Sequence, residues 1–412
     1  MSGIGRKLLQ INATANWGST GKIAEQINQL ARQNGWETYF AYGRNANESQ
    51  SKLIQVGSRC SVLEHFAEHC FLDNDGLASR NATKQLIKRI KEIAPDIIHL
   101  HNIHDHWLNY KLLFEYINTL SIPIVWTQHD CWSFTGGCWY YSNRGCNQWV
   151  IECKSHCPAR KNNRVRRLIN HTQKHYQLKK ELFTATTNLT LVPVSRWLES
   201  ELKKSFLKDK TIYTICNGID TNIFHPVRET RSILQKYGLE GGRYVIGVAS
   251  IWSDRKGFAD YLKLASLIPT DIKIVLVGLD ERQREEATKV GIVGVARTEN
   301  VNELVALYTG AAIVMNLSYE ETFGLTTVEG FACGTPSIVY NATASPELIT
   351  HETGMVVEPG DIEGVSIAVQ SLMKKEKPVK ECRERAVHYY NNVDRFNEYI
   401  SLYDRLILEN NQ

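Results

Sequence analysis

Two glutamates lie on either side of a predicted helix start. Glu321 belongs to the loop after an apolar run, 311–317, and Glu329 follows after seven intervening residues, inside a helix-length segment. Gly324 and Leu325 open that helix, so free backbone N–H groups and the positive end of the helix dipole should border the loop. A phosphate bound there would leave one carboxylate on each side for sugar hydroxyls. Capping and surface solvation use the same residue types, so the pair alone leaves a structural role equally open.

Two basic residues follow a predicted strand of the same half of the chain. Arg255 and Lys256 come soon after the apolar run 244–251. Cations at the carboxyl end of a strand, near the helix that opens at Gly324, would neutralise a diphosphate leaving group. For Arg255 alone, an exposed basic turn is the alternative reading.

Histidines end two predicted strands of the other half. The segment 94–102 finishes on polar residues that include two histidines, and 121–130 finishes on His129 and Asp130. A lone histidine near a strand end is more often structural than catalytic. Two such strand ends at one edge of a sheet favour a shared site. In that site His129 would position a hexose, and Asp130 would orient the imidazole ring of His129.

A glycine-containing loop connects the first predicted strand, 7–12, to a helix at 22–33. Gly18 in this loop would let a phosphate or sugar come close to the backbone. The spacing of the glycines and Lys22 does not fit a Walker loop. An ordinary tight turn between strand and helix is the alternative.

Four cysteines cluster within a distinctive insert, 131–158, with the spacing C-x7-C-x6-C-x3-C. Such thiols can hold a structural zinc ion tetrahedrally and fold a loop that has little core of its own. Free thiols and disulfides are the alternatives, and the second is disfavoured in a reducing compartment. The four candidate ligands are Cys138, Cys146, Cys153 and Cys157.

A basic run follows the insert directly. It contains no acid from Arg160 to Lys180 and has the aromatic residues Tyr176 and Phe183 beside it. Such a run is usually a solvated helix face. Docking onto anionic lipid headgroups, where the protein would meet a lipid-linked acceptor, is the sharper hypothesis.

The elements that must position these residues alternate between apolar strands and helices. This pattern predicts an α/β protein with doubly wound parallel sheets. The length of 412 residues indicates two domains, and Asn217-Gly218 is a turn signal at the start of the second. We therefore predict domains at 1–215 and 216–391, followed by a terminal helix at 392–412.

The composition is that of a globular protein, with 43% hydrophobic and 22% charged residues. A net charge of +4 over this length does not point to nucleic acid. The chain has no stretch of the roughly 20 apolar residues that a membrane-spanning helix needs, and its first residues lack a signal-peptide core. We expect a cytoplasmic protein.

The segment 321–336, ETFGLTTVEGFACGTP, resembles the Glu-x7-Glu signature of retaining family-4 glycosyltransferases. The resemblance implies the GT-B fold, with two Rossmann-like domains facing each other across a cleft. It also implies a nucleoside-diphosphate sugar donor and no metal ion for catalysis. Within the motif, Glu321 would contact the donor sugar and Glu329 the ribose hydroxyls.

Shorter segments extend the resemblance. T-Q-H-D ending at Asp130 is similar to the family's T-x-H-D, N-G-I-D starting at Asn217 to its N-G-[IV]-D, and Lys256-Gly257 to its Lys-Gly. The family's usual arginine lies six residues before that lysine, where this chain has Ser250, so Arg255 would have to replace it. The family's first loop often has two adjacent glycines, which this chain lacks. In the family the final helix commonly crosses back to the first domain.

The resemblance implies transfer of a hexose, with retention, to a hydroxyl of a glycan or lipid-linked saccharide. The cysteine insert looks like that of members assigned to bacterial surface-polysaccharide synthesis. A sugar-nucleotide epimerase of the same fold, or a zinc-stabilised binding protein without catalysis, are the alternatives. The predicted catalytic residues are His129, Glu321 and Lys256. The predicted donor-binding residues are Arg255, Phe323, Gly324, Leu325, Glu329, Gly18 and Asn217.

Overall fold

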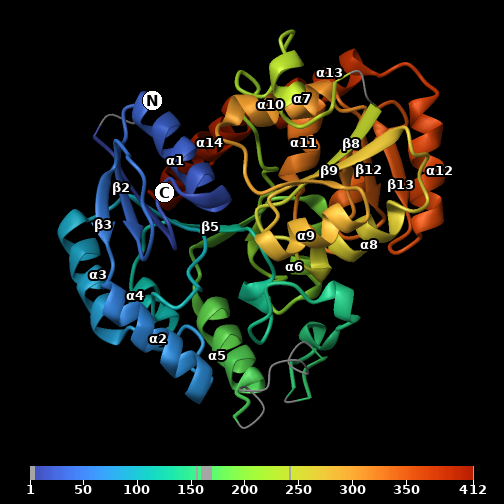
Figure 1. Ribbon diagram of the computed structural model, residues 1–412. Coiled ribbons are helices and arrows are strands. Elements are labelled where there is room, and N and C mark those ends of the chain that lie inside the picture. The colour runs from blue at the N-terminus through green and yellow to red at the C-terminus, as the bar shows by residue number, and fades with distance from the viewer. Residues whose placement is uncertain (1–4, 155, 159–168, 241–242, 412) are drawn as a thin grey trace. The chain divides into compact units, whose positions relative to one another are not determined.

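A computed structural model describes residues 5–154, 156–158, 169–240 and 243–411 of the chain (Figure 1). The chain divides into two compact units. The first unit comprises Met1–Cys216 with Phe396–Gln412, and the second comprises Asn217–Arg395. None of the helices in the described ranges is both long enough and apolar enough to cross a bilayer.

The first unit is built on a seven-stranded sheet in the order β3-β2-β1-β4-β5-β6-β7, and all its neighbouring strands are parallel. Its strands are β1 (Lys7–Asn12), β2 (Glu37–Tyr42), β3 (Lys52–Gln55), β4 (Ile97–Leu100), β5 (Ile124–Gln128), β6 (Leu189–Pro193) and β7 (Thr211–Ile212). Its helices are α1 (Gly18–Gln33), α2 (Arg59–Leu72), α3 (Arg80–Ile93), α4 (Tyr110–Ile117), α5 (Thr172–Ala185), α6 (Arg196–Lys204) and most of α14 (Asn392–Asn410).

The second unit has a six-stranded parallel sheet in the order β10-β9-β8-β11-β12-β13. Its strands are β8 (Arg243–Val248), β9 (Ile272–Val277), β10 (Val293–Val295), β11 (Ile313–Asn316), β12 (Ser337–Tyr340) and β13 (Gly354–Val357). Its helices are α7 (Arg231–Lys236), α8 (Phe258–Leu264), α9 (Glu281–Lys289), α10 (Val301–Gly310), α11 (Leu325–Ala332), α12 (Ile362–Met373) and α13 (Val379–Tyr390).

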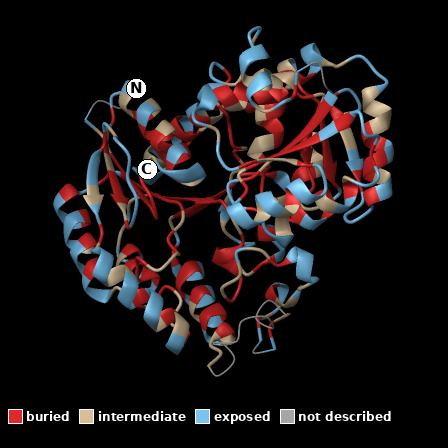
Figure 2. Ribbon diagram, in the orientation of Figure 1, coloured by how far each residue is buried: buried red, intermediate tan, exposed pale blue. Residues whose placement is uncertain are grey.

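Helices cover both faces of each sheet, which confirms the predicted doubly wound α/β architecture (Figure 1). The central strands are accordingly buried along their length, as β4, β5 and β11 illustrate (Figure 2). Strands buried on both faces are continuous apolar runs rather than alternating ones. This is why the apolar runs of the sequence located them well.

Polar contacts hold α14 within the first unit. The Tyr403 hydroxyl lies 2.6 Å from Nδ1 of His99 on β4, and Thr127 Oγ1 on β5 donates to the Tyr399 hydroxyl at 3.0 Å. His99 Nε2 also contacts Thr127 Oγ1 at 2.7 Å, so the four side chains form one buried network. At the rim, Arg6 pairs with Asp404 at 2.6 Å.

We predict that Tyr403→Phe lowers the free energy of unfolding by about 1–3 kcal/mol, because the buried His99 Nδ1 would lose its partner. Tyr389→Phe is the matched control, since Tyr389 is exposed. Chemical denaturation of the two variants and the parent measures the difference. Equal stability of all three would mean that this hydrogen bond does not hold α14 in place.

Candidate active site

The second unit brings three of its predicted site residues, Arg255, Lys256 and Glu321, to one position of its sheet. Strands β8 and β11 are adjacent, and the chain leaves β8 for β9 on one side while β11 lies on the other. The connections from the carboxyl ends of two such strands diverge and leave a crevice, where open α/β sheets bind ligands. The turn η6 (Asp254–Lys256) follows β8, and the loop 317–324 follows β11.

Lys256 and Glu321 meet at this point. The Lys256 ammonium forms an ion pair with Glu321 Oε1, and Ser318 Oγ donates to the same oxygen at 3.1 Å. Both side chains are largely buried, with 18% and 12% of their surface exposed. Burial alone would raise the pKa of Glu321, but the cations Lys256 and Arg255 outweigh it and hold the pKa below its usual value. The site therefore presents an ionised carboxylate beside an ammonium group.

Backbone contacts lock the two loops together. Arg255 Nη1 donates to the Glu320 carbonyl at 2.7 Å, and the Tyr319 amide donates to the Arg255 carbonyl at 2.8 Å. Gly257 has φ +70°, and a Cβ there would lie 2.2 Å from the Leu317 carbonyl oxygen. Only glycine fits such a close approach, which explains why the lysine is followed by one.

Helix α11, which carries Glu329, begins at Leu325, and its N-cap residue Gly324 has φ +105° and forms no side-chain cap. Glu329 Oε2 accepts a hydrogen bond from the Tyr308 hydroxyl at 2.9 Å. Leu325 is half-buried at the helix start. Phe323 is buried, and its ring packs against Tyr390 with centroids 5.7 Å apart. The Phe323 ring is therefore a packing element of the loop.

In the first unit, a buried hydrogen-bond chain reaches His129. Gln10 Nε2 donates to the Ala24 carbonyl at 2.9 Å, which turns its Oε1 toward His101 Nε2 at 2.6 Å. His101 Nδ1 in turn lies 3.0 Å from His129 Nε2. Burial lowers the pKa of His129 to about 4 and that of His101 well below its usual value, so both rings are neutral at pH 7.

The chain of partners fixes the tautomer of both rings. Gln10 Oε1 can only accept, so His101 carries its proton on Nε2 and accepts at Nδ1. His129 must then donate from Nε2, which leaves a lone pair on its Nδ1. Gln10 and His101 are the positioning residues that the site prediction missed. A signal existed in the polar glutamine inside the otherwise apolar strand 7–12.

Asp130 was predicted to orient His129, but its short contacts lie elsewhere. Asp130 Oδ2 is 2.8 Å from His104 Nε2, and its Oδ1 accepts from the Trp132 amide at 2.8 Å. Burial alone would lower the pKa of His104, but Asp130 and Asp105 raise it to about 10. With this pKa His104 is charged at pH 7, and it lies beside the strand end that carries His129.

The remaining predicted donor-binding residues lie at element boundaries. Gly18 is the first residue of α1, is exposed and has φ +67°. Gly21 in the same helix is the glycine that packing requires, because a Cβ there would lie 2.7 Å from Thr14 Oγ1. Asn217 is buried at the start of the second unit.

The cysteine insert folds as three short 3-10 turns, η1 (Trp132–Phe134), η2 (Ser142–Arg144) and η3 (Gln148–Val150). Its thiols influence one another. A hydrogen bond to Cys157 and burial raise the pKa of Cys138, and burial raises that of Cys153 to about 12. In the described ranges, two groups of at least three His, Cys, Asp or Glu side chains bring ligand atoms within 4.8 Å of one another, and neither contains a cysteine.

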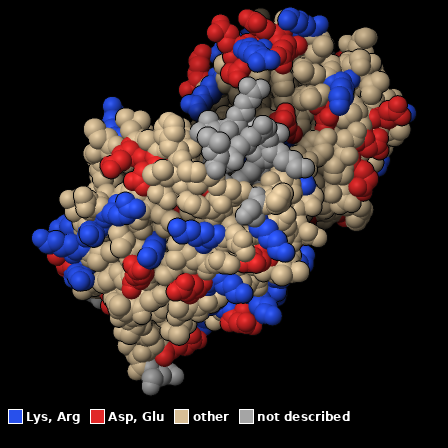
Figure 3. Space-filling view, turned by 90° about the horizontal axis from the view of Figure 1, so that it is seen from below, with Lys and Arg blue, Asp and Glu red and all other residues tan. Residues whose placement is uncertain are grey.

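Part of the basic run, 159–168, lies outside the described residues. Beyond it, the prediction of a surface was wrong for Lys179, whose ammonium lies buried 2.8 Å from the Trp132 carbonyl and 3.4 Å from the centre of the Trp132 ring. Tyr176 and Phe183 are buried as well, so neither can meet a lipid surface. The face shown in Figure 3 carries basic and acidic side chains interspersed.

We predict that nitrogen NMR of the histidine rings at pH 7 places the protons of both His101 and His129 on Nε2. Gln10→Leu removes the acceptor that orients His101, so the two rings should no longer both carry their proton on Nε2. Gln10→Glu retains an acceptor and should preserve the Nε2 protonation of both rings. An unchanged spectrum in Gln10→Leu, or a proton on His129 Nδ1 in the parent, would refute the assigned chain.

Comparison with known proteins supplies the family. The family model "Glycosyltransferase Family 4" matches residues 23–223, and "Glycosyl transferases group 1" matches residues 229–389. Together the two matches run through both units and include every predicted catalytic residue.

Curated relatives are similar over part of their length. The chain is 28% identical over 167 residues to the Escherichia coli protein named colanic acid biosynthesis glycosyl transferase WcaC, covering 38% of this chain and 40% of that protein. It is 26% identical over 223 residues to N-acetyl-alpha-D-glucosaminyl L-malate synthase of Bacillus anthracis, covering 52% of this chain and 58% of the relative. The matches thus span about half the length of these relatives.

Solved structures are similar over almost the whole chain. Sucrose-phosphate synthase from Thermosynechococcus elongatus superposes with a TM-score of 0.71 at 17% identity, covering 98% of this chain and all of that one. Anabaena HepE in complex with UDP gives a TM-score of 0.66 at 14% identity, covering 97% and 100%. At these identities the likeness shows the fold, which is the predicted GT-B fold. Because both family models match and together run through both units, the chain belongs to the family-4, or group 1, glycosyltransferases.

Proposed function

We propose that this protein transfers a hexose from a nucleoside-diphosphate sugar to a hydroxyl of a glycan or lipid-linked saccharide, with retention at the anomeric carbon. The observation that carries the proposal is the ion pair of Lys256 and Glu321 between the carboxyl ends of β8 and β11. The uncapped start of α11 lies at the end of the same loop. The ammonium of Lys256 and the backbone amides at the start of α11 can bind the diphosphate, and the carboxylate of Glu321 can bind sugar hydroxyls.

Lys256 has the role of stabilising charge on the leaving diphosphate. An ammonium held by a carboxylate and largely shielded from water stabilises developing negative charge more strongly than an exposed one. Amides at the start of α11 assist it, and Arg255 is the proposed replacement for the family's missing arginine. Glu321 contacts the donor sugar, while Glu329, oriented by Tyr308, accepts from the ribose hydroxyls.

His129 contributes an acceptor. In the tautomer that Gln10 and His101 impose, Nδ1 carries a lone pair, which suits a hydrogen bond from a sugar hydroxyl. Its depressed pKa keeps the ring neutral, so it orients the sugar without adding charge. The departing phosphate takes the proton of the acceptor hydroxyl on the same face of the sugar, and no protein base is required.

Several finer assignments stay proposals. A role in bacterial polysaccharide synthesis is supported by the name of the relative WcaC, and a UDP donor by the ligand of the HepE structure. Asn217, Gly18, Phe323 and Leu325 stay predicted donor-binding residues. Cytoplasmic location and peripheral membrane contact through the basic run also stay predictions, now without Tyr176 or Phe183.

The experiment is turnover of the full chain with UDP-, GDP- and dTDP-sugars and an acceptor panel. We predict that Lys256→Ala and Glu321→Gln each lower kcat by about 10²–10³-fold, because both act on charge that develops in the transition state. Glu329→Ala should mainly raise the KM for the donor. Lys289→Ala and Glu285→Gln are matched controls on the exposed surface of α9.

The outcomes separate the alternatives. Transfer to an acceptor supports the proposal, and inversion at the anomeric carbon would overturn its stereochemistry. Release of free UDP without an acceptor product would indicate an epimerase instead. Unchanged turnover in Lys256→Ala and Glu321→Gln would contradict the assigned site. If none of the tested sugar nucleotides binds, the result would favour the alternative of a zinc-stabilised binding protein without catalysis.

The four-cysteine zinc site also stays a prediction. Four thiols suit tetrahedral zinc, and a hydrogen bond joins Cys138 to Cys157, although no three of the four thiols converge within 4.8 Å. We predict by elemental analysis that Cys153→Ser loses one zinc ion per chain relative to the parent. Cys60→Ser, which changes an exposed cysteine far from the insert in sequence, is the control and should lose none. Equal zinc content in both would refute the site.

A further inference from the structure

Helix α2 packs on the first unit by an unusual inner face. Its buried residues are His65 and His69, while Leu63, Phe66 and Phe71 are exposed. A surface helix normally buries apolar side chains against the core and exposes polar ones. The two histidines are four residues apart, so they lie on the same face of the helix. The buried face of α2 therefore presents two imidazole side chains to the rest of the unit.

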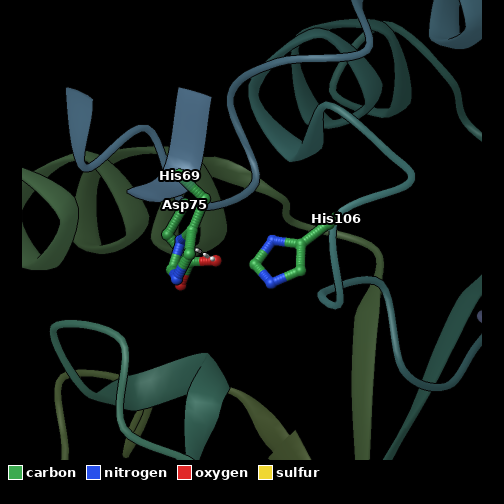
Figure 4. Close-up of side chains that lie close together, drawn as sticks. All are labelled: His69, Asp75 and His106. Atoms are coloured by element: carbon green, nitrogen blue, oxygen red, sulfur yellow. Dashed lines mark ion pairs between the residues drawn. The ribbon is translucent and has the colours of Figure 1, made fainter. Parts of the chain in front are cut away.

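Two other segments bring ligands to this face. Asp75, from the loop after α2, places Oδ1 3.5 Å from His69 Nδ1. His106, from the loop after β4, has its ring tilted at 51° to that of His69, with the two ring centroids 4.3 Å apart. Figure 4 shows His106 directed at the His69–Asp75 pair from a separate stretch of chain. One ligand atom of each of the three residues lies within 4.8 Å of the other two.

The backbone pays a conformational cost to aim His106. Asp105 and His106 have φ +80° and +64°, two consecutive left-handed residues that are not glycine. Residues with a Cβ rarely adopt this conformation, and such strain collects at functional positions. Trp132 Nε1 donates a hydrogen bond to Asp75 Oδ2 at 3.3 Å. Hydrogen bonds of this kind commonly orient carboxylates that bind metal ions.

His65 adds an independent observation. Its side chain has no exposed surface, its Nδ1 contacts Ser79 Oγ at 2.8 Å, and its Nε2 has no hydrogen-bond partner. Its ring lies 5.6 Å from that of His106. Buried polar atoms are nearly always satisfied, so an unpartnered nitrogen beside three converging ligands points to a missing polar group.

We propose that His69, Asp75 and His106 form a binding site for a divalent transition-metal ion such as zinc, bordered by His65. Imidazole and carboxylate ligands suit such ions, whereas magnesium and calcium prefer oxygen ligands alone. Asp75 and His106 each keep part of their surface exposed, which leaves a route of entry. Bound there, the ion cross-links α2 to the loops after α2 and β4 and replaces the apolar packing that α2 lacks. The site is structural and separate from the transfer chemistry.

The test uses Co²⁺ as the probe, added to the full chain after removal of metals with a chelator. A site of imidazole and carboxylate gives visible d–d bands without the near-ultraviolet charge-transfer band of thiolate, which distinguishes it from the cysteine insert. We expect His106→Gln and Asp75→Asn to weaken the thiolate-free Co²⁺ binding by at least about tenfold. His388→Gln, at an exposed histidine of α13, is the control and should bind as the parent does.

A second measurement on the unaltered protein keeps the proposal falsifiable if a variant fails to fold. On addition of Zn²⁺, the ring nitrogen resonances of His69 and His106 should shift together, at one equivalent beyond any zinc that the cysteine insert takes up, while His388 stays in place. Unchanged Co²⁺ affinity in a folded His106→Gln, Co²⁺ binding through thiolate alone, or unmoved His69 and His106 resonances would each overturn the proposal.

Discussion

The geometry of parallel strands is the constraint on which the rest of this structure depends. In a parallel sheet every strand delivers its following loop to the same edge, and two adjacent strands whose connections diverge leave room between those loops. In the second unit that position lies between β8 and β11, where Lys256 meets Glu321. In the first unit the order places β1 beside β4 in the same way, and Gln10 reaches His101 across that pair.

The same constraint explains why the site residues are supported so heavily. A carboxylate and an ammonium group can stay ionised while largely buried only if their partners are fixed. The loop after β11 achieves this with backbone contacts to Arg255 and with Thr343, whose hydroxyl contacts both the amide and the carbonyl of Glu321. Gly257 permits the close approach that these contacts need. The Lys256-Gly257 pair therefore reflects how closely the two loops approach each other.

Polar groups carry much of the packing in the first unit. His99, Thr127, Tyr399 and Tyr403 form one buried network, and His101 with His129 and Gln10 forms another. Buried networks of this kind specify one arrangement, because every member needs its partners at the right distance. Helix α2 differs from these two networks, because its buried His65 leaves Nε2 without a hydrogen-bond partner beside three converging ligands. That contrast is what singles out its inner face.

The sequence by itself determined the two parallel sheets and the strand ends that carry the candidate site residues. Strands buried on both faces must be continuous apolar runs, and the residues after such runs must lie at one edge, so His129, Lys256 and Glu321 could be picked without coordinates. Only the tertiary structure decided which partners each residue has. His101 rather than a neighbour in sequence contacts His129, Asp130 engages His104, and Lys179 of the basic run is buried. Such pairings join residues 26 to 91 positions apart, and local pattern carries no information on distances across a sheet or between its loops.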